Sequence, residues 1–288
     1  MDVHLPRTLD EALELKAAHP EALPIAGGTD VMVEINFDRH RPEAMIDISR
    51  LEELRTWRRE NGSMFLGAGV TYSRIMRELP GFRPWVQASR TVGSPQIRNR
   101  GTPGGNLGTA SPAGDALPVL AAYDAEIVTI GASGGERSLP WHEFHVGVKK
   151  NALRPDELIL GARWKVVRGP GSFSKIGTRN AMVISMAGLC LVVDEAGRNV
   201  RVALGSVAPT IVRASDAEAF AAREMAGAGA WDDPAASLPE ATLEEFGERV
   251  AAAARPIDDI RGTAAYRRHA CSVLARRALA WAIEDRKG

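Results

Sequence analysis

The sequence predicts an α+β protein with two domains, because it divides into two unlike parts. Its 288 residues are enough for two domains. Up to about residue 170, short apolar strand candidates alternate with short helix candidates and glycine-rich turns. From residue 171 onward, three strand candidates precede three alanine-rich helix candidates. We therefore expect one domain over residues 1–170 and a second over residues 171–288.

In the first part, local signals place most elements. Thr8 is a typical N-cap for a helix over 9–19, and Glu11 completes a capping box. The pair Asn61-Gly62 readily takes the positive φ angles of a hairpin turn. The other elements expected here are strands at 23–26, 45–48, 64–70, 125–130 and 158–167, helices at 71–79 and 116–122, a turn at 131–135, a connector at 138–144, a helix or extended segment at 31–37, and a helical or irregular segment at 84–92. Residues 92–100 and 101–115 are expected to be loops.

The second part reads as an antiparallel meander followed by helices. Its strands are expected at 173–178, 184–194 and 200–207, and residues 194–199 supply the turn between the last two. The helices are expected at 215–225, 242–254 and 263–285, with a surface loop over 226–241. The arginines of the last helix fit a solvated or salt-bridged face better than a nucleic-acid patch.

Composition excludes several classes of protein. Lysine plus arginine equals aspartate plus glutamate, which argues against nucleic acid as a main partner. The two cysteines, Cys190 and Cys271, belong to no metal-binding pattern and are expected to be structural thiols in a reducing compartment. Neither a signal peptide nor an apolar run of membrane-spanning length is visible, so a cytoplasmic location is expected.

The chain is organised around a glycine-rich stretch at residues 101–115. These fifteen residues contain five glycines and two prolines, interspersed with Thr, Ser, Asn and Asp. Such a composition is typical of a loop whose backbone N–H groups approach an anion closely. A smaller segment of the same kind, Ala26-Gly-Gly-Thr-Asp30, follows the apolar residues 23–25. Together the two segments predict two contacts with one extended phosphate-bearing ligand.

Catalysis by side chains of this chain is not indicated. His142 and His145 are three residues apart, but no acidic cluster accompanies them, and a metal site there is not expected. A nucleophile elbow, a P-loop and the dinucleotide fingerprint of a Rossmann fold are all absent from the sequence. Two anion-binding segments without acid or base residues are what we expect where a bound cofactor carries the chemistry.

Several motifs of this sequence, taken together, resemble those of a known protein family. The chain is similar to the FAD-binding (medium) subunits of the molybdenum hydroxylases, of the carbon monoxide dehydrogenase and xanthine dehydrogenase type. The shared motifs run in the family's order along nearly the whole chain. They are Ala26-Gly-Gly-Thr-Asp30, Gln96-Ile-Arg-Asn-Arg-Gly-Thr-Pro-Gly-Gly-Asn106, Thr109-Ala-Ser-Pro-Ala-Gly-Asp115, Arg154-Pro-Asp-Glu-Leu158, Gly205-Ser-Val-Ala-Pro-Thr-Ile-Val-Arg213 and Arg261-Gly-Thr-Ala-Ala-Tyr-Arg-Arg268.

The resemblance implies a fold. It implies an FAD-binding domain of two α/β subdomains, at about residues 1–58 and 59–170. A C-terminal domain of a three-stranded antiparallel sheet and a helical bundle would follow. FAD would lie extended between the two subdomains.

The resemblance also implies the residues that hold FAD. The first pyrophosphate-binding segment would be Ile25, Ala26, Gly27, Gly28, Thr29 and Asp30. The second would be Thr102, Gly104, Gly105, Asn106, Thr109 and Asp115, where Asp115 can accept hydrogen bonds from ribose hydroxyls. Apolar contacts to the flavin or adenine would come from Val92, Ile97 and Ile159, and Lys175 would reach the flavin ring. No catalytic residue and no metal ligand is expected.

The sequence departs from the commoner family pattern at two residues. Pro103 stands where Ile or Leu is common, and Gly108 where a larger residue is usual, so the rigidity of the loop could differ. With only two cysteines, the extra iron–sulfur cluster that some members carry in this subunit is not expected.

The implied function is electron transfer. A molybdenum-cofactor large subunit would oxidise the substrate, and a [2Fe–2S] small subunit would pass electrons to FAD in this chain and on to an external acceptor. One alternative is a self-contained flavin oxidoreductase with its own substrate site, and another is an assembly protein without a cofactor. The substrate, the terminal acceptor and the stoichiometry of the assembly do not follow from this chain.

Overall fold

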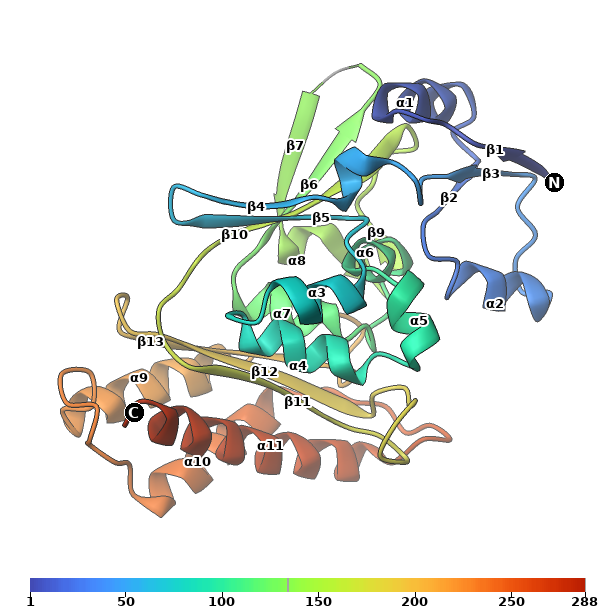
Figure 1. Cartoon of the computed structure of the whole chain (residues 1–288). Coiled ribbons are helices and arrows are strands. Elements are labelled where there is room, and N and C mark those ends of the chain that lie inside the picture. The colour runs from blue at the N-terminus through green and yellow to red at the C-terminus, as the bar shows by residue number, and fades with distance from the viewer. Residues whose placement is uncertain (134, 288) are drawn as a thin grey trace.

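The computed structural model describes residues 1–133 and 135–287. Residue 134, in the turn expected at 131–135, and residue 288, at the end of the expected second domain, lie outside the described residues. Three larger sheets and one of two strands make up the described residues, and helices lie between the larger sheets and beneath the last (Figure 1). The mixture of helices and strands confirms the predicted α+β class.

A small parallel sheet with two helices forms the N-terminal part. Its strands are ordered β1-β3-β2, with β1 at Asp2–His4, β2 at Leu23–Ile25 and β3 at Ala44–Asp47. Helix α1 (Leu9–Ala18) begins at Thr8, whose Oγ1 accepts from the Glu11 N–H at 3.2 Å. The predicted capping box is only half formed, because the Glu11 carboxylate accepts from the Arg7 N–H instead. Residues 31–36 form a helix, α2 (Val31–Asn36).

A five-stranded antiparallel sheet forms the middle of the molecule, with its strands ordered β4-β5-β10-β6-β7. A short 3-10 helix (Glu52–Arg55) leads into it. Its strands are β4 (Trp57–Glu60), β5 (Ser63–Gly67), β6 (Glu126–Gly131), β7 (Gly135–Pro140) and β10 (Glu157–Lys165). The predicted hairpin turn joins β4 to β5, with φ of 50° at Asn61 and 73° at Gly62.

Five short helices connect β5 to β6 and lie beneath this sheet (Figure 1). They are α3 (Tyr72–Glu78), α4 (Arg83–Thr91), α5 (Pro95–Arg100), α6 (Pro103–Thr109) and α7 (Ala116–Ala122). Two of them correct the sequence prediction, because residues 92–100 and 101–115 were expected to be loops. The cause is local capping: Ser94 and Thr102 each accept from the N–H three residues on, and a proline follows each of them at the first helical position.

The segment after β7 also differs from the prediction of a connector at residues 138–144. Residues 135–140 form β7, which pairs with β6 along its length. A short helix and a two-stranded sheet follow, namely α8 (Trp141–Phe144), β8 (His145–Gly147) and β9 (Lys150–Asn151). Neither β8 nor β9 is long enough to give a recognisable periodicity in the sequence.

The last sheet is the predicted antiparallel meander with one addition. Strands β11 (Gly171–Ile176), β12 (Ala187–Asp194) and β13 (Asn199–Gly205) pair in sequence order. A fourth strand of two residues, β14 (Val212–Arg213), pairs with β13 and was not expected. The three predicted helices follow as α9 (Ser215–Gly227), α10 (Glu240–Ala253) and α11 (Ala264–Asp285).

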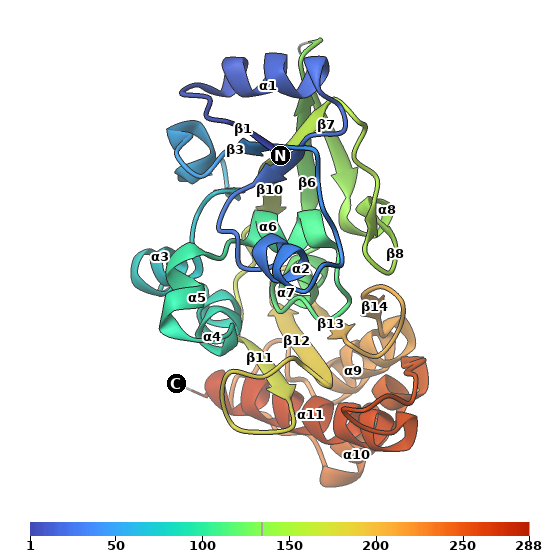
Figure 2. The same cartoon turned by 90° about the vertical axis from the view of Figure 1, so that its right-hand side faces the viewer.

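Helices cover both faces of this last sheet, which lies between α4 and α7 on one side and α9 to α11 on the other (Figures 1 and 2). Along β12, Cys190 and Val192 pack into the core shared with α4 and α7, whereas Leu189, Leu191 and Val193 pack into the core shared with α9 to α11. Burial on both faces explains why β12 reads as an unbroken apolar run. Among the described residues, no helix is both long and apolar enough to cross a membrane.

One buried histidine makes stability depend on pH. His145 is 9% exposed, its Nε2 has no hydrogen-bond partner among the described residues, and burial lowers its pKa from 6.5 to about 4. The unfolded chain therefore binds more protons between pH 6.5 and 4, so stability is lost as the pH falls through that window. We expect His145 to account for a fall of about 2 kcal/mol in the free energy of unfolding between pH 7 and 4.5.

Urea unfolding at several pH values checks this expectation. His145→Phe removes the titrating group while filling the same space, and should flatten the dependence between pH 6.5 and 4. An unchanged slope in that variant would contradict the assignment to His145.

Candidate functional site

The first glycine-rich segment connects β2 to α2. Gly28 has a φ of 72°, which favours glycine. None of the backbone N–H groups of residues 26–30 donates a hydrogen bond within the described part of the chain. All but the last of these residues are only partly exposed. Five successive unpaired N–H groups in a tight turn form a concave set of donors suited to an anion.

The second segment forms the short helix α6 and its flanks. Thr102 caps this helix, its Oγ1 accepting from the Gly105 N–H at 2.9 Å. Gly104 lies against the neighbouring strand end so closely that a Cβ there would sit 2.4 Å from the Ala68 carbonyl oxygen. Gly105 is exposed, and a Cβ there would come no closer than 3.4 Å to the Thr102 Oγ1. The helix ends at Ala110, whose φ is 48°.

The structure brings the two segments into direct contact. A Cβ on Gly27 would lie 2.1 Å from the carbonyl oxygen of Arg100, so the two backbones touch there. The Thr109 hydroxyl donates to the Asp30 carboxylate at 3.0 Å. Residues separated by about seventy positions in the sequence therefore form one continuous surface of backbone donors and hydroxyl groups.

Asn106 is held at the centre of this surface by side-chain and backbone donors. Its Oδ1 accepts from the Tyr72 hydroxyl at 2.7 Å and from the Ala116 N–H at 3.4 Å. Burial raises the pKa of Tyr72 well above its usual value, so the hydroxyl stays a donor. Both bonds fix the amide of Asn106, and its Nδ2 has no hydrogen-bond partner within the described part of the chain.

Three of the expected apolar residues border the same region. Ile159 of β10 is buried beneath α6, with its Cδ1 about 4.0 Å from the place where a Gly108 Cβ would be. Val92 follows α4, and Ile97 lies in α5. Gly93 has a φ of 44° and packs against Ile97, so both residues lie at the junction of α4 and α5.

Asp115 and Lys175 form a buried ion pair that joins the glycine-rich region to the last sheet. Their side chains are 7% and 8% exposed, and Nζ lies 2.6 Å from Oδ2. The Thr91 hydroxyl also donates to Asp115, and Lys175 donates to the carbonyls of Thr91 and Val183. Burial raises the pKa of Asp115, and the charge of Lys175 opposes that rise. The Lys175 ammonium has three N–H donors, and all three are used by Asp115, Thr91 and Val183. A hydrogen bond to a flavin ring would therefore replace one of these bonds.

The residues fit a dinucleotide better than they fit a catalytic centre. Gly27 lets the first segment touch the second, and the unpaired N–H groups of residues 26–30 match phosphate oxygens. Among the described residues, no group of three or more His, Cys, Asp or Glu side chains could hold a metal ion. Cys190 and Cys271 are buried, and burial raises the pKa of Cys271 to about 12.

Two contributors to this site were missed by the sequence reasoning. Tyr72 reaches Asn106 across thirty-four positions of sequence, and Thr91 reaches Asp115 across twenty-four. Neither lies in a glycine-rich motif, and their roles depend on how α3 and α4 pack. No local signal in the sequence could have identified them.

Comparison with known proteins decides the family. A family described as the FAD binding domain in molybdopterin dehydrogenase matches residues 1–163. The chain belongs to this family. A second family, the CO dehydrogenase flavoprotein C-terminal domain, matches residues 172–282. This chain is therefore an FAD-binding subunit of the molybdenum hydroxylase type, which confirms the resemblance seen in its motifs.

Individual relatives agree with the family assignment of this FAD-binding subunit. It is 36% identical to the nicotinate dehydrogenase FAD-subunit of Eubacterium barkeri over 67% of this chain and 69% of that one. It is 30% identical to a putative xanthine dehydrogenase FAD-binding subunit of Escherichia coli over 97% and 95% of the two chains. A solved carbon monoxide dehydrogenase from Hydrogenophaga pseudoflava matches with a TM-score of 0.85, at 26% identity and 98% coverage of both chains.

Proposed function

We propose that this subunit accepts electrons from a [2Fe–2S] partner and passes them to an external acceptor, within a complex that also contains a molybdenum-cofactor large subunit. The observation that carries the proposal is the contact between the two glycine-rich segments, which places the unpaired N–H groups of residues 26–30 beside α6, where a dinucleotide could lie. FAD supplies the redox chemistry when bound, because it exchanges electrons singly or in pairs. The chain itself binds and orients the cofactor.

We further propose the roles of individual residues. Residues 25–30 and the Thr102, Gly104, Gly105, Asn106 and Thr109 set would hold the pyrophosphate through N–H and hydroxyl donors. Val92, Ile97 and Ile159 would contact the rings, and Asp115, paired with Lys175, would face the ribose. These assignments correspond to an FAD-binding domain at 1–170 and a C-terminal flavoprotein domain at 171–288.

Exposed apolar side chains support the presence of protein partners. Helix α2 exposes Met32 and Val33, and Phe37 just after it is also exposed. The loop between β11 and β12 exposes Met182 and Ile184. Both elements lie on the side that faces the viewer in Figure 2. Several large apolar residues exposed together are typical of an interaction surface. Relatives named as medium chains, such as that of the carbon monoxide dehydrogenase of Hydrogenophaga pseudoflava, match over 98% of this chain.

Two buried free thiols suit a reducing compartment, and we propose a cytoplasmic location.

The test compares the isolated chain with the complete complex. We expect the purified, FAD-loaded chain to retain flavin absorption but to remain oxidised when mixed anaerobically with candidate substrates. The co-expressed complex should show flavin reduction after substrate is added, preceded by bleaching of the iron–sulfur absorption in rapid mixing. Substrate-driven flavin reduction in the isolated chain would instead support a self-contained flavin oxidoreductase.

A further inference from the structure

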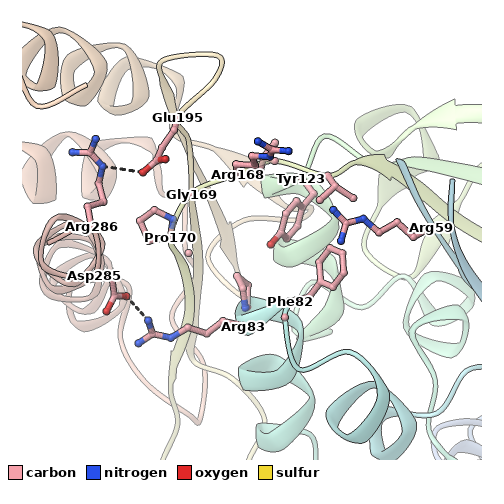
Figure 3. A pocket seen from close by; sticks show the side chains of 15 residues that line it. Arg59, Phe82, Arg83, Tyr123, Arg168, Gly169, Pro170, Glu195, Asp285 and Arg286 are labelled. Carbon is pink, nitrogen blue, oxygen red and sulfur yellow. Dashed lines mark hydrogen bonds and ion pairs between the residues drawn. The ribbon is translucent and has the colours of Figure 1, made fainter. Parts of the chain in front are cut away.

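A cavity of about 700 Å³ lies between the two halves of the chain, away from the glycine-rich segments. Its walls come from β4, the start of α4, the connector between β10 and β11, and the end of α11 (Figure 3). None of the residues expected to hold FAD lines it. The cavity is therefore separate from the FAD site proposed above.

Arginines dominate the charge of this cavity, which we call the arginine cavity. The lining includes four of them, Arg59, Arg83, Arg168 and Arg286, against two carboxylates, Asp285 and Glu195. Arg83 pairs with Asp285, and the Arg286 Nε lies 3.1 Å from Glu195 (Figure 3). Within the described part of the chain, Arg59 and Arg168 have no carboxylate within 4.0 Å. Two guanidinium groups, both on exposed residues, are thus left in excess.

Arg286 supplies a second, independent observation. Its side chain is only 3% exposed, although a guanidinium is strongly hydrated in the unfolded chain. Its Nη1 is buried and has no hydrogen-bond partner among the described residues. A buried charged donor left without an acceptor costs free energy. Because Nη1 is closed to solvent, a bound anion recovers this free energy only if a neighbouring side chain moves aside.

Two neutral features add further donors. The Tyr123 side chain is 7% exposed, its hydroxyl has no hydrogen-bond partner among the described residues, and burial raises its pKa, so it stays protonated. Figure 3 shows the guanidinium of Arg59 extending toward this ring. Helix α4 begins at the cavity wall without a side-chain cap at Phe82. The partial positive charge of a helix N-terminus favours an anion.

We propose that the arginine cavity binds a phosphate-bearing anion. Guanidinium groups bind phosphate through paired N–H donors, and the hydroxyl of Tyr123 provides one more. The volume exceeds what a single phosphate fills, so the ligand can be a nucleotide as well as free phosphate or pyrophosphate. The aromatic rings of Phe82 and Tyr123 offer apolar contact for a nucleotide base.

Isothermal titration of the FAD-saturated chain tests this proposal, with inorganic phosphate, pyrophosphate and ADP as separate probes. Saturation with FAD prevents ADP from occupying the glycine-rich site. We expect at least one probe to bind, and expect Arg59→Gln and Arg168→Gln each to weaken its binding about tenfold. Much tighter binding of ADP than of pyrophosphate would indicate that the base contributes.

Arg58→Gln is the matched control. Arg58 is the neighbour of Arg59 in β4, but it stacks on Phe65 and does not line the cavity. Its replacement removes the same charge and should change the affinity less than about twofold, since the cavity is left intact. Failure of all three probes to bind the wild-type chain would overturn the proposal. Equal weakening by Arg58→Gln and Arg59→Gln would also overturn it, because binding would then follow net charge alone.

Discussion

Replacing Gly27 by alanine is expected to abolish retention of FAD. The added Cβ would lie 2.1 Å from the Arg100 carbonyl oxygen. The backbone fixes the positions of both atoms, so no side-chain rotation can relieve the clash. The two glycine-rich segments must then separate, and the donors on them no longer face one ligand. A displacement costing about 3 kcal/mol of binding free energy corresponds to roughly a hundredfold weaker affinity.

Fluorescence titration of the purified variant with FAD measures this loss. Gly227→Ala is the control, since Gly227 ends α9 and a Cβ there meets nothing within 4 Å. That variant should bind FAD as the wild type does. Thermal unfolding of the FAD-free proteins separates lost binding from lost folding. Wild-type affinity in Gly27→Ala would show that the contact between the segments does not organise the site.

The second large effect is expected at the ion pair between Asp115 and Lys175. Lys175→Met leaves a buried carboxylate whose one remaining side-chain donor, among the residues that the structure describes, is the Thr91 hydroxyl. Removing one member of a buried pair costs about 3–5 kcal/mol. Because burial already raises the pKa of Asp115, we expect the variant to lose more stability at neutral pH than at pH 4, where protonation removes the charge. Urea unfolding at both pH values measures the difference.

The double variant Asp115→Asn/Lys175→Met provides the control for this pair. Without either charge, it should recover at least half of the stability lost in Lys175→Met. Strand β11, which carries Lys175, packs against α4, so the single variant should also loosen the contact between the last sheet and the preceding helices. If both variants are equally unstable, the loss arises from packing and not from the unpaired charge.

The sequence predicted best those elements of the fold that depend on residues close together along the chain. The hairpin at Asn61-Gly62 and the cap at Thr8 involve neighbouring residues, and the structure confirms both. The long strands and helices after residue 171 were predicted from apolar runs, from the turn at 194–199 and from the alanine-rich composition of the last helices, all of which are local signals. In contrast, α6 was expected to be a loop, because its glycines lower helix propensity. A close contact with Ala68 requires glycine at position 104, and this contact is invisible in the sequence.

The candidate site also combines features that the sequence predicts with contacts that it does not. The two glycine-rich segments could be identified by composition, and their residues by resemblance to a family. Their contact through Gly27 and the Arg100 carbonyl, and the bond from Tyr72 to Asn106, join distant parts of the chain. The pairing of Lys175 with Asp115 likewise depends on the packing of β11 against the first part. Such long-range contacts leave no pattern in a single sequence.

A crystal structure of the FAD-loaded chain tests the central claim most directly, namely that the two glycine-rich segments together hold the cofactor. We predict that the pyrophosphate oxygens lie within hydrogen-bond distance of the backbone N–H groups of residues 26–30 and of the start of α6. Pyrophosphate density that contacts only one segment, or that lies in the arginine cavity instead, would contradict the claim.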